Sequence, residues 1–310
     1  MNKYHQIIHP SFNQTYIKQI IIKHKTIHSF DLLNDNIDLK TVESFGEEWE
    51  KFDAFSATEI ENIGNEYFDI VPDDIFNNQE TRALDLGCGS GRWSIYLSSK
   101  VKSIDAIDPS KAIFSAARLA NDIPNIQFSQ ASVDNIPFDD ETFDFGMSLG
   151  VLHHIPDTRD ALNKFAKKIK PNGYALIYLY YALDNRSSIY RFIFNLSTLV
   201  RKAISKFPTR LKKISCDIIA FTVYLPFVGL SWFVKLISGN RFYKKIPLHY
   251  YLSKSLNVIR NDSLDRFGTP LEQRFTKEKI EEMMHNAGFY ELIFSDKMPY
   301  WHVVGRKKSI

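Results

Sequence analysis

The residues best suited to chemistry lie within residues 84–108, where three alternating glycines follow a short apolar run and carboxylates lie on either side. The glycines are Gly87, Gly89 and Gly91. Glycine lets the backbone turn sharply and approach a ligand that a Cβ atom would exclude. Asp85 precedes the glycines, and Asp108 ends the next apolar run, where a carboxylate can accept hydrogen bonds from ribose hydroxyls. This combination predicts a site for a ligand that contains a nucleoside.

The order of the glycines separates two kinds of nucleoside ligand. Dinucleotide-binding loops follow G-x-G-x-x-G, in which the loop wraps a pyrophosphate. Here the order is G-x-G-x-G, and Arg92 stands where the third glycine of that fingerprint would fall. A dehydrogenase is therefore the weakest interpretation. A tight turn without any ligand is the plain alternative, and the two carboxylates argue against it.

Positioning these residues requires strands that end at one edge of a sheet, and from residue 82 the sequence predicts such an arrangement. Short apolar runs alternate with helical patterns, which is typical of a doubly wound, mostly parallel, Rossmann-like α/β sheet. The expected strands are 83–86, 103–107, 126–129, 143–149 and 174–180. The expected helices are 92–99, 111–120 and 159–169, the last capped by Asp157 or Thr158.

The alternation stops at residue 181 and resumes near the C-terminus. Residues 276–287 are expected to form a helix with Thr276 as its cap, and strands at 290–294 and 301–304 are expected to form an antiparallel edge pair. The 310 residues fit one core with a large insertion. We expect residues 1–80 to form an extension and cap, 81–181 the cofactor-binding core, 182–250 a helical insertion, and 251–310 the completion of the core sheet.

Residues 83–181 resemble the core of class I S-adenosylmethionine-dependent methyltransferases, in the small-molecule, methyltransferase type 11-like branch. The matching pieces are 84–91, 107–108, 133–138, 143–156 and 170–173. The resemblance implies a Rossmann-like fold and S-adenosylmethionine as the cofactor. It also implies that Asp85 contacts the methionine end of the cofactor, that the glycines pass beneath it, and that Asp108 holds the ribose.

Further roles follow from the same resemblance. Relatives usually carry an aspartate for the adenine amine where this chain has Ser132, although Val133 still offers its backbone N–H. Leu149 stands at the cofactor-lining end of the fourth strand. Asn172 replaces a glycine in the turn before the fifth strand, where asparagine tolerates a left-handed backbone. Relatives with a Phe-Gly-x-x-Trp segment use it to cap the cofactor, which assigns Trp49 to that role, with packing outside the site as the alternative.

Methyl transfer from a sulfonium is an in-line displacement with a neutral leaving group, so the enzyme mainly supplies proximity and alignment. A base is needed only where the acceptor loses a proton in the transition state. His153, just past the fourth strand, is the best-placed candidate base. The alternative is that His153 and His154 are structural. Adjacent histidines point in different directions, and no metal site is expected.

The acceptor is expected beyond the carboxyl end of the fifth strand, where ligands bind in open α/β sheets. Tyr181 and Arg186 lie in the segment that leaves this strand, and Arg186 could pair with a carboxylate or phosphate. Arg274, with Glu272, is expected near the same pocket. The alternatives are an ordinary turn or helix cap at Asp184 and Asn185 and an internal salt-bridged turn at residues 265–275.

The insertion combines basic and apolar residues. Residues 182–250 hold twelve Lys or Arg and two acids, a local net charge of +10, while the chain totals +3 and the remainder is therefore −7. Such asymmetry indicates an anionic partner. Residues 218–234 carry no charge, but Pro226 and Gly229 interrupt them. We therefore expect two short helices that form a hydrophobic lid and that also suit docking on an anionic membrane surface, in preference to a transmembrane helix.

These features predict a methyltransferase that uses S-adenosylmethionine to methylate a small-molecule or lipid-linked acceptor, at oxygen or carbon. The alternatives are an RNA methyltransferase, since clustered cations also suit nucleic acid, and a non-catalytic S-adenosylmethionine-binding protein. Only two cysteines occur, Cys88 and Cys216, which suits a reducing compartment. We expect a cytoplasmic protein with peripheral membrane contact through residues 182–250.

Overall fold

The computed structural model describes residues 9, 11–32, 35–51, 56–77, 80–239 and 242–309, with only the helical backbone described for 47–51, 189 and 193. The chain divides into two compact units. The first comprises Met1–Asn185 and Leu271–Ile310, and the second comprises Arg186–Pro270.

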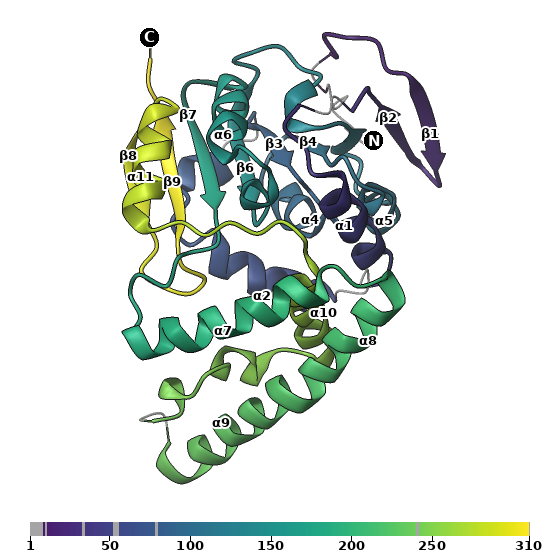
Figure 1. Ribbon diagram of the computed structural model, residues 1–310. Coiled ribbons are helices and arrows are strands. Elements are labelled where there is room, and N and C mark those ends of the chain that lie inside the picture. The colour runs from purple at the N-terminus through teal and green to yellow at the C-terminus, as the bar shows by residue number, and fades with distance from the viewer. Residues whose placement is uncertain are drawn as a thin grey trace, which may run out of the picture. The chain divides into compact units, whose positions relative to one another are not determined.

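The first unit is built on a nine-stranded sheet in the order β1-β2-β5-β4-β3-β6-β7-β9-β8. Figure 1 shows β8 and β9 at one edge and β1 and β2 at the other. The strands from β2 to β7 pair in parallel, whereas β9 runs antiparallel to both β7 and β8. The strand bounds are β1 Lys18–Ile22, β2 Lys25–Ser29, β3 Arg82–Leu86, β4 Ser103–Ile107, β5 Ile126–Gln130, β6 Phe143–Leu149, β7 Ile169–Tyr178, β8 Phe289–Phe294 and β9 His302–Lys307.

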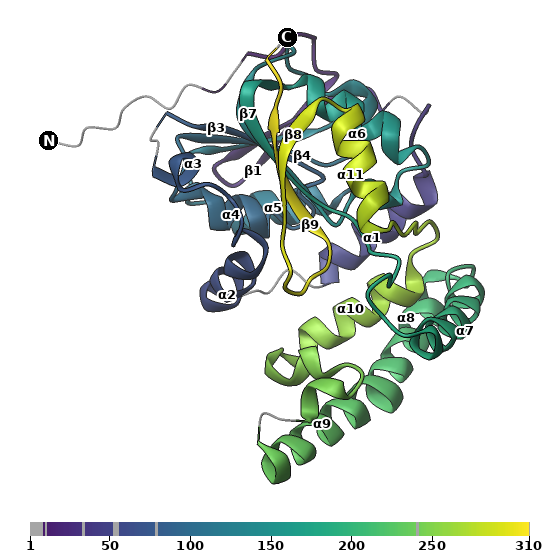
Figure 2. The same cartoon turned by 90° about the vertical axis from the view of Figure 1, so that its left-hand side faces the viewer.

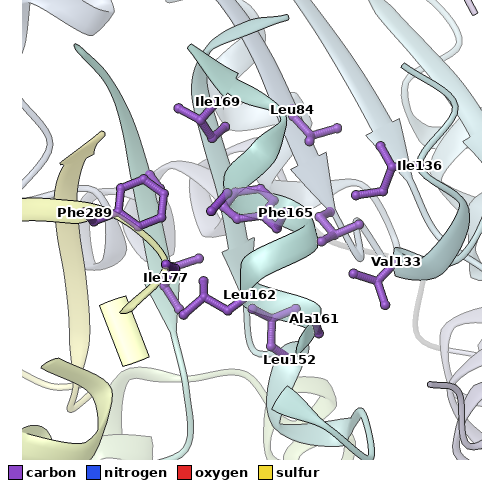
Figure 3. Packing of buried hydrophobic residues seen from close by; sticks show 14 of the residues in the cluster. Leu84, Val133, Ile136, Leu152, Ala161, Leu162, Phe165, Ile169, Ile177 and Phe289 are labelled. Carbon is purple, nitrogen blue, oxygen red and sulfur yellow. The ribbon is translucent and has the colours of Figure 1, made fainter. Parts of the chain in front are cut away.

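Helices cover both faces of this sheet because successive strand residues point to opposite faces. Phe165 of α6 and Met284 of α11 share one apolar core with Leu84 of β3, and Figure 3 shows part of this core. The neighbouring Ala83 belongs to a second core, with residues of α2, α3, α4 and α5. The helix bounds in this unit are α1 Leu39–Lys51, α2 Ala57–Tyr67, α3 Asp73–Asn77, α4 Arg92–Ser98, α5 Ala112–Leu119, α6 Thr158–Lys167 and α11 Lys277–Asn286, with short 3-10 turns η1 Val133–Asn135 and η2 Leu152–His154.

The Rossmann-like, mostly parallel sheet with an antiparallel last strand is confirmed. Asp157 caps α6 by accepting hydrogen bonds from the backbone N–H groups of Arg159 and Asp160, and Thr276 caps α11 in the same manner. The predicted turn before the fifth strand becomes a register shift inside β7, where Asn172 has φ 64°. The hairpin of β1 and β2 was not predicted from the sequence, and it extends the parallel sheet through the pairing of β2 with β5.

The second unit is entirely helical in its described residues. It contains α7 Ser188–Ile204, α8 Thr209–Ile219, the π-turn η3 Ala220–Tyr224, α9 Leu225–Ser238, the 3-10 turns η4 Tyr243–Lys245 and η5 His249–Ser253, and α10 Leu256–Gly268. Both α7 and α8 pack on α10 (Figures 1 and 2). The compact helical unit extends to Pro270, beyond the boundary expected at residue 250.

The expectation of two short helices around Pro226 was wrong. Residues Thr209–Ser238 form one continuous helix of 30 residues, which is long and apolar enough to cross a membrane by length and composition. In an α-helix each backbone N–H donates to the carbonyl four residues earlier, and proline has no N–H to donate. The π-turn just before it changes the bonding pattern, with the N–H of Leu225 donating to the carbonyl of Ala220. The helix therefore passes through the proline without a break.

Candidate cofactor and acceptor site

The glycine loop follows β3 and is held against the end of β4. Gly87, Gly89 and Gly91 have φ of 80°, 52° and 78°, in the left-handed region that favours glycine. The N–H groups of Gly87 and Cys88 both donate to the carbonyl of Ile107, at 2.8 and 2.9 Å. A Cβ atom on Gly87 would lie 2.3 Å from a methyl group of Val151, so this position also requires glycine for space. The loop is thus fixed at the carboxyl ends of two neighbouring strands.

Asp85 lies on β3 directly before the loop and is fully buried. Its Oδ2 accepts a hydrogen bond from the Ser94 hydroxyl at 2.6 Å, while its Oδ1 has no hydrogen-bond partner among the described residues. Burial raises the pKa of this carboxyl to about 7, and the nearby charge of Asp108 adds to the rise, whereas the bond from Ser94 opposes it. A buried acceptor without a partner is costly unless a ligand supplies the donor.

Asp108 ends β4 and contacts the loop directly. Its Oδ2 accepts from the N–H of Gly89 at 2.9 Å, and its Oδ1 accepts from the N–H and hydroxyl of Ser110 at 2.8 and 2.6 Å. Burial raises the pKa of this carboxyl as well, although the three hydrogen bonds work against the rise. Each carboxylate oxygen has two lone pairs, so Oδ2 can accept one further hydrogen bond, from a ribose hydroxyl.

The expected adenine side lies after β5. Ser132 is buried, and its hydroxyl oxygen has no hydrogen-bond partner among the described residues. Val133 follows as the first residue of η1, and Leu149 is the last residue of β6. Ser132, Val133 and Leu149 thus lie at or just past the carboxyl ends of the parallel strands β5 and β6.

These residues fit S-adenosylmethionine. The orphaned Oδ1 of Asp85 suits the ammonium group of its methionine part, and Asp108 suits a ribose diol. The hydroxyl of Ser132 offers a polar partner where an adenine would lie. None of these assignments needs a metal, and no group of three His, Cys, Asp or Glu in the described part of the chain could hold one.

Helix α1 packs against residues that follow β4 and β6. A Cβ atom on Gly46 would lie 3.3 Å from the backbone nitrogen of Lys111, and the ring of Phe45 lies 4.8 Å from that of His154, edge to face. The side chain of Trp49 lies outside the described residues. Its role as a cap on the cofactor therefore remains a prediction.

His153 lies just past β6, fully buried between His154 and Tyr180. Its ring stacks on Tyr180 with 3.9 Å between ring centres. Burial lowers the pKa of His153 well below 6.5, and the nearby His154 and Arg274 lower it further. The ring is therefore neutral. The N–H of Tyr180 donates to Nδ1 at 3.3 Å, a bond that assigns the ring proton to Nε2. The one lone pair of the neutral ring faces a backbone amide here, and Nε2 has no hydrogen-bond partner among the described residues, so the role of general base remains a prediction.

Residues 271–275 run beside the segment that leaves β7. Tyr181 and Phe275 pair in parallel, and the N–H of Gln273 donates to the carbonyl of His153 at 3.0 Å. Arg274 binds the buried Glu272 through Nε at 2.9 Å and the carbonyl of Tyr181 through Nη1 at 3.2 Å. The internal salt-bridged turn considered for this segment therefore forms.

The structure thus brings Tyr181, Arg274 and His153 together around the carboxyl ends of β6 and β7. Arg186 belongs to the helical unit, where its guanidinium lies 5.5 Å from the ring centre of Tyr190. Asp184 is structural, because it accepts from the N–H of Lys277 at 3.0 Å and from the indole N–H of Trp301.

Sequence reasoning missed three residues of this region. Ser94 binds Asp85 from the first turns of α4, Tyr180 stacks on His153, and Gln273 donates through its side chain to the carbonyl of Ile155 at 2.7 Å. Ser94 stands nine residues after Asp85, so the strand–loop–helix pattern could have indicated it. Gln273 had no such signal, because its contact spans more than a hundred residues.

The comparisons with known proteins agree with this geometry. Residues 84–177 match the family model of a methyltransferase domain. The uncharacterized methyltransferase YcgJ of Bacillus subtilis is 30% identical over 109 residues, which are 34% of this chain and 43% of that protein. The demethylmenaquinone methyltransferase of Staphylococcus epidermidis is 33% identical over 98 residues, 30% of this chain and 40% of the relative.

A further relative is the phthiotriol/phenolphthiotriol dimycocerosates methyltransferase of Mycobacterium tuberculosis. It is 27% identical over 95 residues, 30% of this chain and 35% of that protein. The chain spans less than half the length of each of these three relatives.

The sheet order, the glycine loop and the two carboxylates define a Rossmann-like domain of the S-adenosylmethionine-dependent methyltransferase class. Residues 84–177 match the methyltransferase domain family, which agrees with the predicted resemblance to class I S-adenosylmethionine-dependent methyltransferases. This match implies use of S-adenosylmethionine.

Proposed function

We propose that the whole chain transfers a methyl group from S-adenosylmethionine to a small-molecule or lipid-linked acceptor. The observation that carries this proposal is the fully buried Oδ1 of Asp85, which lacks a hydrogen-bond partner among the described residues beside a loop of three left-handed glycines. When bound, S-adenosylmethionine supplies an activated methyl group on a sulfonium. The residues of this chain then need only bind and align it.

The proposed cofactor contacts are divided among four strand ends. Asp85 would hold the methionine ammonium, and the glycines leave room for the ligand above the loop. Asp108 would accept from the ribose, while Ser132 and the N–H of Val133 would contact the adenine. Leu149 would line the same side, and Trp49 on α1 would cap it.

On the acceptor side we propose Tyr181 and Arg274, with Arg186 from the helical unit as a further contact. We assign His153 a role in positioning the segments that would contact the acceptor. Its ring stacks on Tyr180, and its carbonyl accepts from the N–H of Gln273. A lipid-linked acceptor is supported by two relatives, the demethylmenaquinone methyltransferase and the phthiotriol/phenolphthiotriol dimycocerosates methyltransferase. We propose a cytoplasmic location, which the free cysteines Cys88 and Cys216 support.

Calorimetry tests the cofactor assignment. We expect S-adenosylmethionine to bind the wild-type protein and NAD not to bind. Asp108→Ala should weaken S-adenosylmethionine binding by about tenfold to a hundredfold, since one or two charge-assisted hydrogen bonds are lost. Asp184→Ala is a control for loss of a carboxylate outside the cofactor site. Binding of NAD in place of S-adenosylmethionine would refute the proposal.

A further inference from the structure

The long helix Thr209–Ser238 turns its small and polar residues inward. Its buried side chains are Cys216, Ala220, Tyr224 and Ser231, spaced by four, four and seven residues along one side. The helix segments pack on α10 and η5 through this side. Soluble amphipathic helices bury their large apolar residues instead. The packing of this helix is therefore the reverse of what water favours.

The large apolar side chains of the same helix face outward. Exposure reaches 58% for Trp232, 69% for Leu236 and 70% for Ile237. The exposed set comprises Leu211, Ile214, Ile218, Phe221, Val223, Phe227, Leu230, Trp232, Phe233, Leu236 and Ile237. Helix α7 repeats the pattern with exposed Phe192, Leu196 and Leu199, which share one face. So many exposed large apolar side chains on these helices indicate an interaction site.

Charge identifies the chemistry of the partner. Residues 186–270 carry fifteen Lys or Arg and three acids, a net charge of +12. All three acids are engaged within the unit: Asp217 binds Arg260 through two bonds of 2.9 and 2.8 Å, Asp262 accepts from the Tyr251 hydroxyl, and Asp265 accepts from the Thr269 hydroxyl. None of these bonds involves the exposed Lys235, Lys244 or Lys245, whose ammonium groups can attract an anionic surface.

Apolar and cationic groups meet where α9 ends. The last turns of α9 and the neighbouring turn η4 form one end of the helical unit (Figures 1 and 2). The exposed side chains here are Trp232, Phe233, Lys235, Leu236, Ile237, Phe242, Lys244 and Lys245, which we call the α9 tip. Tryptophan and lysine beside aliphatic residues are the composition of an interfacial anchor, with the apolar part among the acyl chains and the ammonium groups at the phosphates.

From these observations we infer that the α9 tip docks the protein peripherally on an anionic lipid bilayer. A spanning position does not fit, because α8 and α10 share the half-buried Asp217–Arg260 ion pair, and α10 also carries Asp262, Asp265 and Arg266. A spanning helix would draw these groups into hydrocarbon. Docking does not require methyl transfer. That docking brings a lipid-linked acceptor to the enzyme rests on the proposed function.

The experiment is flotation of the full-length protein with vesicles. We expect it to float with vesicles of phosphatidylglycerol and phosphatidylcholine in equal parts and to stay behind with phosphatidylcholine alone. Binding should weaken when salt rises, because the screening length is about 10 Å at 0.1 M and shortens further above it.

Two matched pairs of variants locate the surface. Leu236→Glu with Ile237→Glu should weaken flotation by about tenfold or more. The double substitution removes apolar area that would be buried in the bilayer, and its carboxylates are repelled by the anionic lipids. The control is Ile17→Glu with Ile21→Glu, residues of similar exposure, 71% and 73%, near and in β1 of the other unit. Lys244→Gln with Lys245→Gln should weaken binding to anionic vesicles, and Lys18→Gln with Lys23→Gln should not.

Several outcomes would overturn the inference. One is that the tip variants and the control variants float equally, and another is that the wild type does not float. A third is that bound protein resists alkaline extraction, which would indicate a spanning helix. A fourth is that the wild type forms a dimer, that the tip variant is monomeric, and that neither binds vesicles. Salt-sensitive binding of bulk RNA in place of vesicles would overturn it as well. Calorimetry with S-adenosylmethionine on the same preparation separates these failures from a failure of the proposed methyl transfer.

Discussion

Asp85 combines two roles that oppose each other. Its burial destabilises the charged carboxylate, which raises its pKa to about 7, yet a cationic ligand needs that charge. The folded-state pKa lies above the usual 3.8, so the contribution of Asp85 to stability is complete at low pH and is lost as the pH rises through about 7. The ligand-free protein thus holds a destabilising group where the ligand is expected.

Two measurements test this at the residue scale. Affinity for S-adenosylmethionine should fall by about tenfold between pH 8 and pH 6, because protonation of Asp85 competes with the ammonium group. Asp85→Asn should bind weakly with a flat pH profile, and its ligand-free form should melt several degrees higher than wild type at pH 8, by about 2–4 °C for each kcal/mol gained. Equal affinities of the wild type at both pH values would contradict this account.

At the scale of elements, the glycine loop depends on two strands and a turn that meet. Gly87 is held by β4 through the carbonyl of Ile107 and is confined by Val151 after β6. Its φ of 80° and the approach of 2.3 Å both exclude a Cβ atom. The loop conformation is therefore a property of the packed sheet and not of the glycines alone.

Gly87→Ala should therefore destabilise the protein by about 1–3 kcal/mol or more and abolish cofactor binding. The matched control is Gly229→Ala in α9, where a Cβ atom would meet nothing within 4 Å. This control should stabilise its helix by about 0.5–1 kcal/mol, since alanine is the better helix former. Thermal unfolding of both variants measures the difference, and a Gly87→Ala protein as stable as wild type would be inconsistent with the crowding at Val151.

At the scale of the whole molecule, the helical unit is the connection between two parallel segments. Ala182 donates to the carbonyl of Phe275 at 2.8 Å, and Phe275 donates to the carbonyl of Tyr180 at 2.9 Å. Parallel segments need a crossover of a dozen residues or more, and here Arg186–Pro270 supplies it. The crossover also carries the positive charge of the chain, because removing its +12 leaves −9 from the total of +3.

Replacing Arg186–Pro270 by a flexible Gly/Ser linker of about twelve residues, with a reach of about 20 Å, should leave the sheet unit able to fold. We expect this variant to bind S-adenosylmethionine within about threefold of wild type, because the proposed cofactor contacts lie on the sheet unit. It should no longer float with anionic vesicles. A variant that unfolds cooperatively on heating but has lost cofactor binding would place part of the cofactor site in the helical unit.

The sequence by itself determined the parallel sheet, its two C-terminal antiparallel strands and the glycine loop with Asp85 and Asp108. These features depend on local patterns, namely apolar runs, turn residues and caps, which are read within a few residues of one another. The sequence did not predict the hairpin Lys18–Ser29, because its turn, at Lys23 with φ 52°, contains no glycine or asparagine, the residues typical of such turns.

Only the tertiary structure decided which group the Nδ1 atom of His153 accepts from, because its partner Tyr180 lies in the segment that follows β7. Contact with residues 271–275 likewise depends on chain that returns after the whole helical unit. The continuity of Thr209–Ser238 through Pro226 was decided by a π-turn, a change in backbone bonding that no residue type specifies. Which face of that helix is buried followed from packing on α10, since apolar residues surround most of the helix and composition alone marks no inner side.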